Sequence, residues 1–210
     1  GLVLALRGAI GWILVGSRLK AGVIAVAPVK LTLHLGFACL FFAGLVFVWT
    51  RLRLPRDTGE GPRMAALGLW GLIFVQILLG GLVAGSRAGL TYNTWPLMDG
   101  HFIPPAAKLF VVTPLIENFV DNVTLVQFNH RMTGYLVLVA CLLPAILLRR
   151  RLGNAPAARR AASLAGGAVL QVALGIATLL LGVPLWAGLA HQGLAILILA
   201  DATRNLAQTA

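Results

Sequence analysis

Charged residues are scarce in this sequence, and acidic residues are the scarcest. Only 11% of the 210 residues are charged, with 6 Asp+Glu against 17 Lys+Arg, whereas 59% are hydrophobic. A soluble domain of this size keeps roughly a quarter of its residues charged to cover its surface. The shortage of charge therefore excludes a soluble domain and indicates that lipid surrounds much of the chain. The same composition excludes a disordered chain, a collagen-like repeat and a disulfide-stapled secreted domain.

Cysteine is also rare, and the apolar segments lack strict alternation of polar and apolar residues. The two cysteines, Cys39 and Cys141, both fall inside apolar runs, so they offer no disulfide outside the membrane. A membrane β-barrel requires alternating strands, whereas these runs are continuous in Leu, Ala, Val and Gly. We therefore expect an all-α fold, because helices satisfy their own backbone hydrogen bonds in lipid.

Six apolar runs are long enough, or nearly so, to cross a bilayer core of about 30 Å as helices of about 20 residues. They cover residues 1–16, 29–50, 64–85, 123–148, 161–182 and 187–202. The sequence therefore predicts a polytopic membrane helical bundle with six visible transmembrane helices.

The connectors between these runs differ in charge. Segment 51–63 carries four arginines and segment 149–160 carries five, and Arg204 brings this side to ten of the 17 basic residues. Short basic loops remain in the cytoplasm, so the net charge of +11 reflects topology rather than affinity for nucleic acid. The long connector 86–122 then lies on the opposite side. Its length and its prolines predict an ordered loop, in which His101 is a solvated surface residue.

A weak internal repeat recurs three times. Its copies read Arg7-Gly-Ala-Ile-Gly11, Gln76-Ile-Leu-Leu-Gly80 and Gln171-Val-Ala-Leu-Gly175. Each copy precedes a run that carries one histidine near its beginning, and these are His34, His130 and His191. Repeats of this kind are common in membrane proteins, so we expect a bundle built from repeated helix pairs.

The predicted topology places the three histidines at one depth, roughly 5–12 Å below the outer surface at a rise of about 1.5 Å per residue. A lone intramembrane histidine is as readily a packing residue or an interhelical hydrogen bonder as a ligand. Three at one depth favour shared binding of a cofactor, because ionisable groups in a membrane usually mark function. Neutral imidazole is the axial ligand that a buried haem needs. Zinc is a weaker candidate, since thiolates and carboxylates are missing at that depth.

Three histidines leave one without a partner for paired ligation. Because Gly1 lies inside an apolar run, we expect upstream residues that supply a further helix pair and bring the total to eight helices. Residues 1–62 are then the incomplete remainder of an N-terminal half, and residues 63–210 form a C-terminal four-helix half. In this scheme His130 and His191 form the complete pair, and His34 belongs to the incomplete one.

Several motifs resemble the haem A synthase family, most closely its proteobacterial and mitochondrial branch. The most specific are Gly85-Ser-Arg-Ala-Gly-Leu-Thr-Tyr-Asn-Thr-Trp-Pro-Leu-Met-Asp-Gly100, Phe102-Ile-Pro104 and Asn122-Val-Thr-Leu-Val-Gln-Phe-Asn-His-Arg131. Further matches are Gly8-Ala-Ile-Gly-Trp12, Leu33-His-Leu-Gly36 and His191-Gln192. The resemblance extends over nearly the whole chain and corresponds to the last six of the family's eight helices.

The resemblance implies an enzyme that oxidises the C8 methyl group of haem O to the formyl group of haem A, with haem b as a second cofactor. It implies that His130 and His191 hold haem b, and that His34 is an axial ligand at the catalytic site of haem O oxidation. Iron must carry this chemistry while the helices position the substrate. We expect Arg131 to pair with haem propionates, with snorkelling towards the interface as the equal alternative.

Two other interpretations remain at this point. One is a membrane-bound b-type cytochrome that passes electrons without modifying haem, and the other is a non-haem transporter whose histidines bind substrate or protons. The family resemblance implies a haem O synthase and cytochrome oxidase assembly factors as partners, alongside membrane lipid and with a homo-oligomer left open. It implies a multi-pass protein of the bacterial inner membrane, or of the mitochondrial inner membrane in a eukaryote.

Overall fold

The computed structural model describes residues 8, 28–55 and 63–209, and the regular elements of this part of the chain are helices. The long ones are α2 (Pro28–Arg53), α3 (Arg63–Ser86), α6 (Val123–Leu152), α7 (Pro156–Leu180) and α8 (Leu185–Gln208). The short ones are α4 (Ala106–Leu109), α5 (Asn118–Asp121) and the 3₁₀ turns η1 (Ala88–Leu90) and η2 (Leu115–Glu117). All five long helices have the length and composition to cross a membrane. The predicted all-α, multi-pass membrane fold is confirmed. The predicted span 1–16, apart from residue 8, lies outside the described residues.

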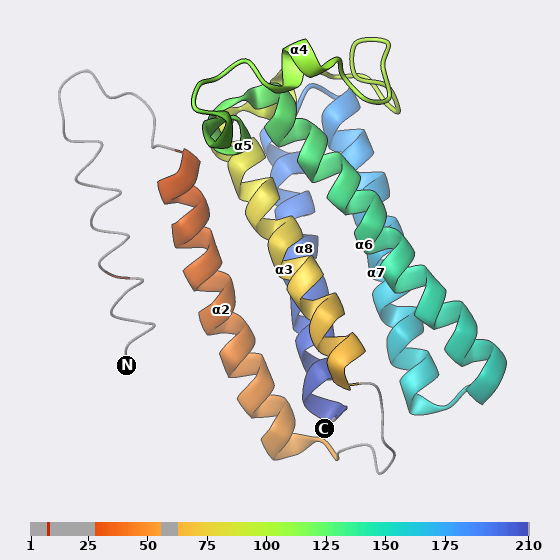
Figure 1. Ribbon diagram of the computed structural model, residues 1–210. Coiled ribbons are helices and arrows are strands. Elements are labelled where there is room, and N and C mark those ends of the chain that lie inside the picture. The colour runs from red at the N-terminus through yellow and green to blue at the C-terminus, as the bar shows by residue number, and fades with distance from the viewer. Residues whose placement is uncertain (1–7, 9–27, 56–62, 210) are drawn as a thin grey trace.

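The long helices lie side by side. The long connector 86–122, the outer connector, covers one end of the bundle (Figure 1). α8 occupies a central place, because it packs against α2, α3 and α7, and α6 packs against α3 and α7. One apolar core joins all five long helices, with Cys39 from α2, Ile73 from α3, Cys141 from α6, Leu164 from α7 and Leu199 from α8. Both cysteines are buried and free, as expected for residues inside the spans.

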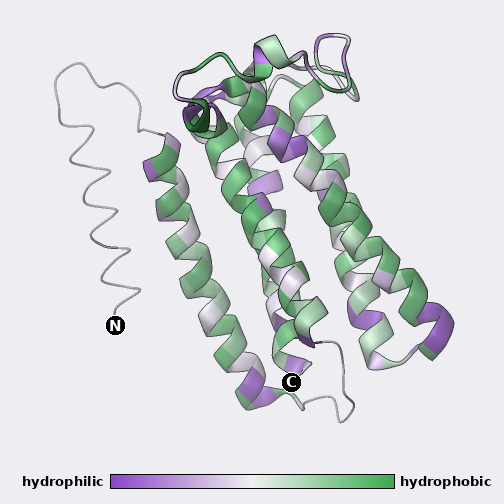
Figure 2. Ribbon diagram, in the orientation of Figure 1, coloured by the Kyte–Doolittle hydropathy of each residue, from purple (hydrophilic) through white to green (hydrophobic). Residues whose placement is uncertain are grey.

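The outer surfaces of the long helices are apolar. Leu45, Val139, Leu170 and Leu197 are exposed members of this surface. Figure 2 shows hydrophobic residues along the helices and hydrophilic residues gathered towards their ends. A soluble protein does not expose apolar surface on this scale, so lipid is the solvent that these faces require.

The basic ends of the helices differ from the prediction. The sequence predicts a connector over 149–160, but residues 149–151 form the last turn of α6, and Arg159 and Arg160 lie near the start of α7. Gly153, with φ of 58°, ends α6, and Pro156 begins α7. α8 likewise continues to Gln208, past its predicted end at residue 202. Charge marks where the hydrocarbon ends, whereas a helix continues into the headgroup region until a residue such as Gly or Pro stops it.

Two buried asparagines hold the outer connector in place. Asn118, which is fully buried, accepts hydrogen bonds from the backbone N–H groups of Val111 and Val112 and donates to two further carbonyl oxygens. Asn122 caps α6 through its Oδ1 atom and donates through Nδ2 to the carbonyl oxygens of Lys108 and Leu109. The loop backbone therefore finds partners in side chains instead of in a sheet or a helix.

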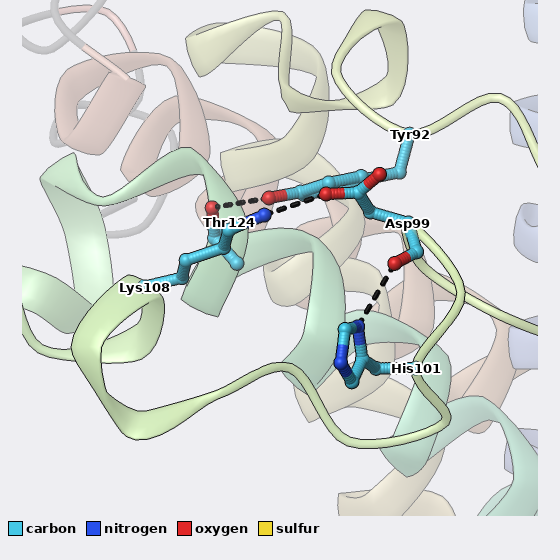
Figure 3. A network of polar contacts seen from close by, with 5 residues as sticks. All are labelled: Tyr92, Asp99, His101, Lys108 and Thr124. Carbon is cyan, nitrogen blue, oxygen red and sulfur yellow. Dashed lines mark hydrogen bonds and ion pairs between the residues drawn. The ribbon is translucent and has the colours of Figure 1, made fainter.

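The exposed face of the connector carries an ion pair (Figure 3). Lys108 Nζ lies 2.5 Å from Asp99 Oδ2, and Nδ1 of the exposed His101 donates to the Asp99 carbonyl oxygen. The hydrogen bond and the charge of Lys108 lower the pKa of Asp99, and Asp99 raises the pKa of Lys108 in return. Tyr92 and Thr124 share a hydroxyl–hydroxyl hydrogen bond of 3.2 Å that joins this loop to α6.

Candidate functional site

A cavity of about 430 Å³ lies between α3, α6, α7 and α8. Its apolar lining includes Ile73, Val137 and Ile198, and residues of the outer connector such as Trp95 complete its outer end. Of the described residues of α2, none lines the cavity. The cavity is therefore built by the four helices that follow residue 62.

Two of the three predicted histidines line this cavity together. The ring centres of His130 and His191 lie 6.5 Å apart, with the ring planes at 79°. His130 is seven residues into α6 and His191 is six residues into α8 (130 less 123, and 191 less 185), so they have matching depths. The structure thus brings these two side chains together from helices that are distant in sequence.

His34 is not part of this pair. It lies six residues into α2 (34 less 28), a position along its helix similar to those of the other two, but it does not line the cavity. Its Nδ1 atom is buried and has no hydrogen-bond partner among the described residues.

Each histidine of the pair contacts a glutamine from the preceding helix. Gln76 Nε2 donates to the carbonyl oxygen of His130 at 3.0 Å and lies 3.1 Å from the ring atom Nδ1. Gln171 Nε2 donates to the carbonyl oxygen of His191 at 3.0 Å and lies 3.3 Å from the ring atom Nε2. These glutamines are site residues that the sequence interpretation did not assign. The repeated Gln-x-x-x-Gly spacing was the signal that could have found them.

The glycine of each repeat lets the histidine ring approach the helix backbone. Gly80 and Gly175 lie four residues after their glutamines and therefore on the same helix face. A Cβ atom at Gly175 would lie 2.8 Å from Cε1 of His191, and one at Gly80 would lie 3.2 Å from Cε1 of His130. In each repeat, the glutamine therefore gives the histidine ring a polar contact, and the glycine leaves room for the ring beside the helix backbone.

Unpartnered polar atoms concentrate in the cavity. Among the described residues, seven buried side-chain nitrogen or oxygen atoms lack a hydrogen-bond partner. Six of the seven belong to residues that line the cavity: Gln76, Gln127, Arg131, Gln171, His191 and Gln192. Buried polar groups in folded proteins are nearly always paired, so such a cluster indicates a site for a ligand with polar groups of its own.

Arg131 connects the cavity to residues 92–97 of the outer connector, which form the cover of the cavity. Its guanidinium donates to the carbonyl oxygens of Tyr92 at 2.8 Å, Thr94 at 3.0 Å and Leu97 at 3.5 Å, while Nε is buried without a partner. Gln127 adds a bond to the same Tyr92 oxygen at 3.2 Å. The sequence suggested two roles for Arg131, pairing with haem propionates and snorkelling towards the interface. Binding the carbonyl oxygens of the loop is a third role that the sequence did not suggest.

The donor set fits haem better than a bare metal ion. In the described part of the chain, no three His, Cys, Asp or Glu side chains are grouped to hold a metal, and two imidazoles alone do not complete a tetrahedral zinc site. A porphyrin supplies four nitrogen ligands itself and requires only axial ones. Two imidazoles on opposite sides of a metal, at bonds of about 2 Å each, have ring centres roughly 6–7 Å apart. The observed spacing of 6.5 Å lies in this range.

These features define a class: a multi-pass helical membrane protein with a pair of facing histidines in a polar-edged cavity between four helices. The family model COX15-CtaA, described as cytochrome oxidase assembly protein, matches residues 1–203. The chain belongs to this family.

Several similar proteins bear the name "Heme A synthase". The protein of Methylobacterium sp. (strain 4-46) is 56% identical over 207 residues, covering 98% of this chain and 58% of that protein. The protein of Methylobacterium nodulans is 57% identical over 204 residues, covering 95% and 56%. The protein of Beijerinckia indica subsp. indica is 47% identical over 208 residues, covering 96% and 57%. The chain thus spans little more than half the length of these relatives.

Proposed function

We propose that this chain is the larger part of a haem A synthase, which oxidises the C8 methyl group of haem O to the formyl group of haem A. The observation that carries the proposal is the pair His130 and His191, held 6.5 Å apart across a cavity with many unpartnered polar atoms. The similar proteins named "Heme A synthase" supply the reaction. The family description supports a place in cytochrome oxidase assembly.

In this proposal the four helices after residue 62 hold haem b. His130 and His191 would hold the haem iron, and the bound haem would supply one-electron chemistry that side chains lack. Ile73, Val137 and Ile198 form an apolar wall that would exclude water from the bound group. Arg131, whose buried Nε has no partner, would meet the carboxylates at the outer end.

His34 belongs to the second, substrate-binding half in this proposal. It lies six residues from the start of its helix, as His191 does, and its buried Nδ1 atom has no partner among the described residues. We assign it as an axial and catalytic ligand at the site of haem O oxidation, with residues 1–62 as part of that half. This division of the chain at residue 62 agrees with a cavity that draws no described residue from α2.

The location follows from the distribution of charge. Arginines of α2, α3, α6 and α7 lie at the end of the bundle away from the outer connector, as Arg53, Arg63, Arg151 and Arg159 illustrate. The positive-inside rule puts that end in the cytoplasm. We therefore propose a bacterial inner-membrane protein with the cavity near the outer surface, which receives haem O from a haem O synthase and supplies haem A for cytochrome oxidase assembly.

A reduced-minus-oxidised spectrum of the full-length protein, purified in detergent, tests the haem assignment. We expect a six-coordinate b-type signal that His130→Ala and His191→Ala each abolish. His101→Ala is the matched control, because this histidine is exposed in the outer connector and should leave the signal intact. A wild-type protein without such a signal, or a signal that survives both cavity substitutions, would overturn the assignment.

Pigment analysis tests the reaction itself. Cells that express the full-length protein beside a haem O synthase should accumulate haem A, and His34→Ala should leave haem O in its place while the b-type signal persists. Haem O without haem A in the wild-type cells would contradict the enzyme and favour a b-type cytochrome that passes electrons only.

A further inference from the structure

We infer that the cavity is a pseudo-symmetric site built from two copies of one helix pair, and that the unequal residues Ile73 and Ala168 determine which way round a flat ligand with unequal edges is bound in it. The inference rests on the proposed haem b site, since haem b is such a ligand. It assigns a selective role to two apolar side chains that make no polar contact with the bound group.

The four helices around the cavity form a ring. α3 packs against α6 and α8, and α7 packs against the same two helices. α3 and α7 run towards the outer connector, whereas α6 and α8 run away from it (Figure 1). A half-turn about an axis along the middle of the cavity therefore exchanges α3 with α7 and α6 with α8. Membrane proteins often contain parallel repeats that are related in this way.

The residues that line the cavity follow the same symmetry. Gln171 is 95 positions after Gln76, and His191 is 61 positions after His130 (171 less 76, and 191 less 130). Every α3 residue that lines the cavity, shifted by 95 positions, falls on an α7 residue that lines it. Every α8 residue that lines it, shifted back by 61 positions, falls on a lining residue of α6. The symmetry therefore extends along each helix face, well beyond the Gln-x-x-x-Gly motif.

The polar contacts at the centre of the cavity repeat as well. Gln76 Nε2 donates to the carbonyl oxygen of His130 at 3.0 Å, and Gln171 Nε2 donates to that of His191 at 3.0 Å. Because the half-turn exchanges the two histidines, its axis passes between their rings. A flat group held by both rings then has its faces towards α6 and α8, which carry the histidines, and its side edges towards α3 and α7.

The symmetry is broken at the inner end of the cavity. On the inner side of the glutamines, α3 and α7 each contribute one lining residue, and these are Ile73 and Ala168. Both residues are buried. The side chain of isoleucine is far larger than the methyl group of alanine, so less room remains beside α3 than beside α7 at this level.

Haem b is asymmetric at only one of its ends. Its two carboxylate chains lie at the other end and fit the outer part of the cavity, where Nε of Arg131 is buried without a partner. Turning haem b over about the cavity axis exchanges these two chains with each other. The unequal outer pair Ala84 and Leu179 therefore does not distinguish the two orientations. At the inner end the same turn exchanges a methyl group with a vinyl group, so selection falls to Ile73 and Ala168, with the larger vinyl group beside the alanine.

Proton NMR of the ferric full-length protein in detergent measures the ratio of the two orientations, because each gives its own set of shifted haem methyl signals. In the wild type one set should exceed the other about fourfold, since one further buried carbon is worth about that factor in an equilibrium constant. Ile73→Ala gives both halves the same residue and should bring the two sets to comparable intensity. Ile73→Val perturbs packing less and should give an intermediate ratio.

The reciprocal variant tests the direction of the selection. Ile73→Ala combined with Ala168→Ile exchanges the two residues between the halves of the cavity. The minor set of methyl signals in the wild type should become the major set in this variant. A major set that stays the same would assign the selection to other residues and overturn the inference.

Leu164→Ala is the matched control. Leu164 is buried in the same apolar core and lies on α7, but it does not line the cavity. The substitution removes a comparable side-chain volume, so it should lower thermal stability without changing the ratio of orientations. If Leu164→Ala shifts the ratio as Ile73→Ala does, the effect is a general loosening of the bundle and the inference is wrong. It is also wrong if neither single substitution of Ile73 changes the ratio.

Failure of this inference can be distinguished from failure of the proposed function. A wild-type protein with a b-type signal and two equal sets of methyl signals would refute the inference alone and leave the haem site in place. A wild-type protein without a b-type signal would refute the haem site and the inference together.

Discussion

Gly175 lies directly against the ring of His191, so closely that a Cβ atom at this position would be 2.8 Å from Cε1. The glycine is therefore required by the ring, since real Cβ atoms do not approach other carbons at this distance. The equivalent approach at Gly80 is 3.2 Å, which is tight but can be relieved by a small shift of His130. The two halves of the site thus tolerate an added methyl group to different degrees.

The first prediction follows from this difference. Gly175→Ala should displace the ring of His191, break its contact with Gln171 and remove most of the b-type signal, and Gly80→Ala should weaken the signal less. Overpacking of this kind lowers the free energy of unfolding by about 1–3 kcal/mol. We expect a loss near the lower end of this range, because a side-chain ring can move more readily than backbone. Spectroscopy and thermal unfolding in detergent measure the two effects.

Gly166 provides the matched control on the same helix as Gly175, since a Cβ atom there meets nothing within 4 Å. Gly166→Ala should keep the spectrum and stabilise α7 by up to about 1 kcal/mol through helix propensity. If Gly175→Ala retained the full b-type signal, the close approach of the His191 ring to Gly175 would be irrelevant to ligand binding.

The second prediction concerns the contact between Arg131 and the outer connector. Lysine has one compact ammonium group and cannot reproduce the planar fork that reaches carbonyl oxygens of Tyr92, Thr94 and Leu97. Hydrogen bonds from a charged group contribute about 1.5–3 kcal/mol each, so Arg131→Lys should increase opening of this segment at least tenfold.

Hydrogen exchange over residues 92–97 measures this opening. Arg150→Lys, at an exposed position near the end of α6, should leave the exchange unchanged. Equal protection in the wild type and in Arg131→Lys would show that other contacts hold the loop.

The third prediction is a pH range for the exposed ion pair of the connector. The pKa of Asp99 is lowered from its ordinary value of 3.8, so its contribution is complete above that pH and is lost as pH falls through the lower, folded value. The pKa of Lys108 is raised from 10.5, so its contribution is complete below that pH and is lost as pH rises through the higher value. The pair should therefore persist between these limits.

Carbon-13 NMR of the Asp99 carboxyl group follows this titration. Lys108→Met should return the carboxyl group to an ordinary titration near pH 3.8. A carboxyl that titrates identically with and without Lys108 would mean that the pair is not formed in solution.

The fourth prediction concerns Asn118, which is fully buried and makes four hydrogen bonds to the loop backbone. Asn118→Leu keeps the branched shape of the side chain but leaves backbone groups unpaired, at a cost of about 1–3 kcal/mol for each buried group that water cannot reach. We expect the outer connector to become the first segment cut in limited proteolysis. Glu117→Ala, a change at the exposed neighbouring residue, should leave the cleavage pattern as in the wild type. Resistance of both variants to proteolysis would argue against this role of Asn118.

Much of the fold could be predicted from the length of the apolar runs, because in lipid a helix is the only structure that satisfies such a run on its own. Four predicted beginnings, at residues 29, 64, 123 and 187, fall within two residues of α2, α3, α6 and α8. The beginning of α7 was missed by five residues, since Arg159 and Arg160 were assigned to a connector. Hydrophobicity locates the membrane, but capping residues such as Pro156 locate the helix end.

The proximity of two of the three histidines was predicted, whereas their roles stay predictions. The predicted topology indicated that His130 and His191 have equal depth, and the structure places their ring centres 6.5 Å apart with nearly perpendicular planes. The repeated Gln-x-x-x-Gly spacing marks Gln76 and Gln171, but it does not show what they contact, because a contact between neighbouring helices depends on how each helix is rotated about its axis. The periodicity of a helix that is apolar on all sides carries little information on that rotation.

The cover of the cavity, residues 92–97, is held in part through its backbone. Arg131 and Gln127 both bind main-chain carbonyl oxygens of residues 92–97, and every amino acid carries the same carbonyl group. The exposed Leu97 can therefore be substituted over evolution without loss of the contact between its carbonyl oxygen and Arg131, provided that this arginine stays the same. The entrance to the cavity can thus acquire new surface chemistry, suited to a different delivery or acceptor protein, while the interior keeps its geometry.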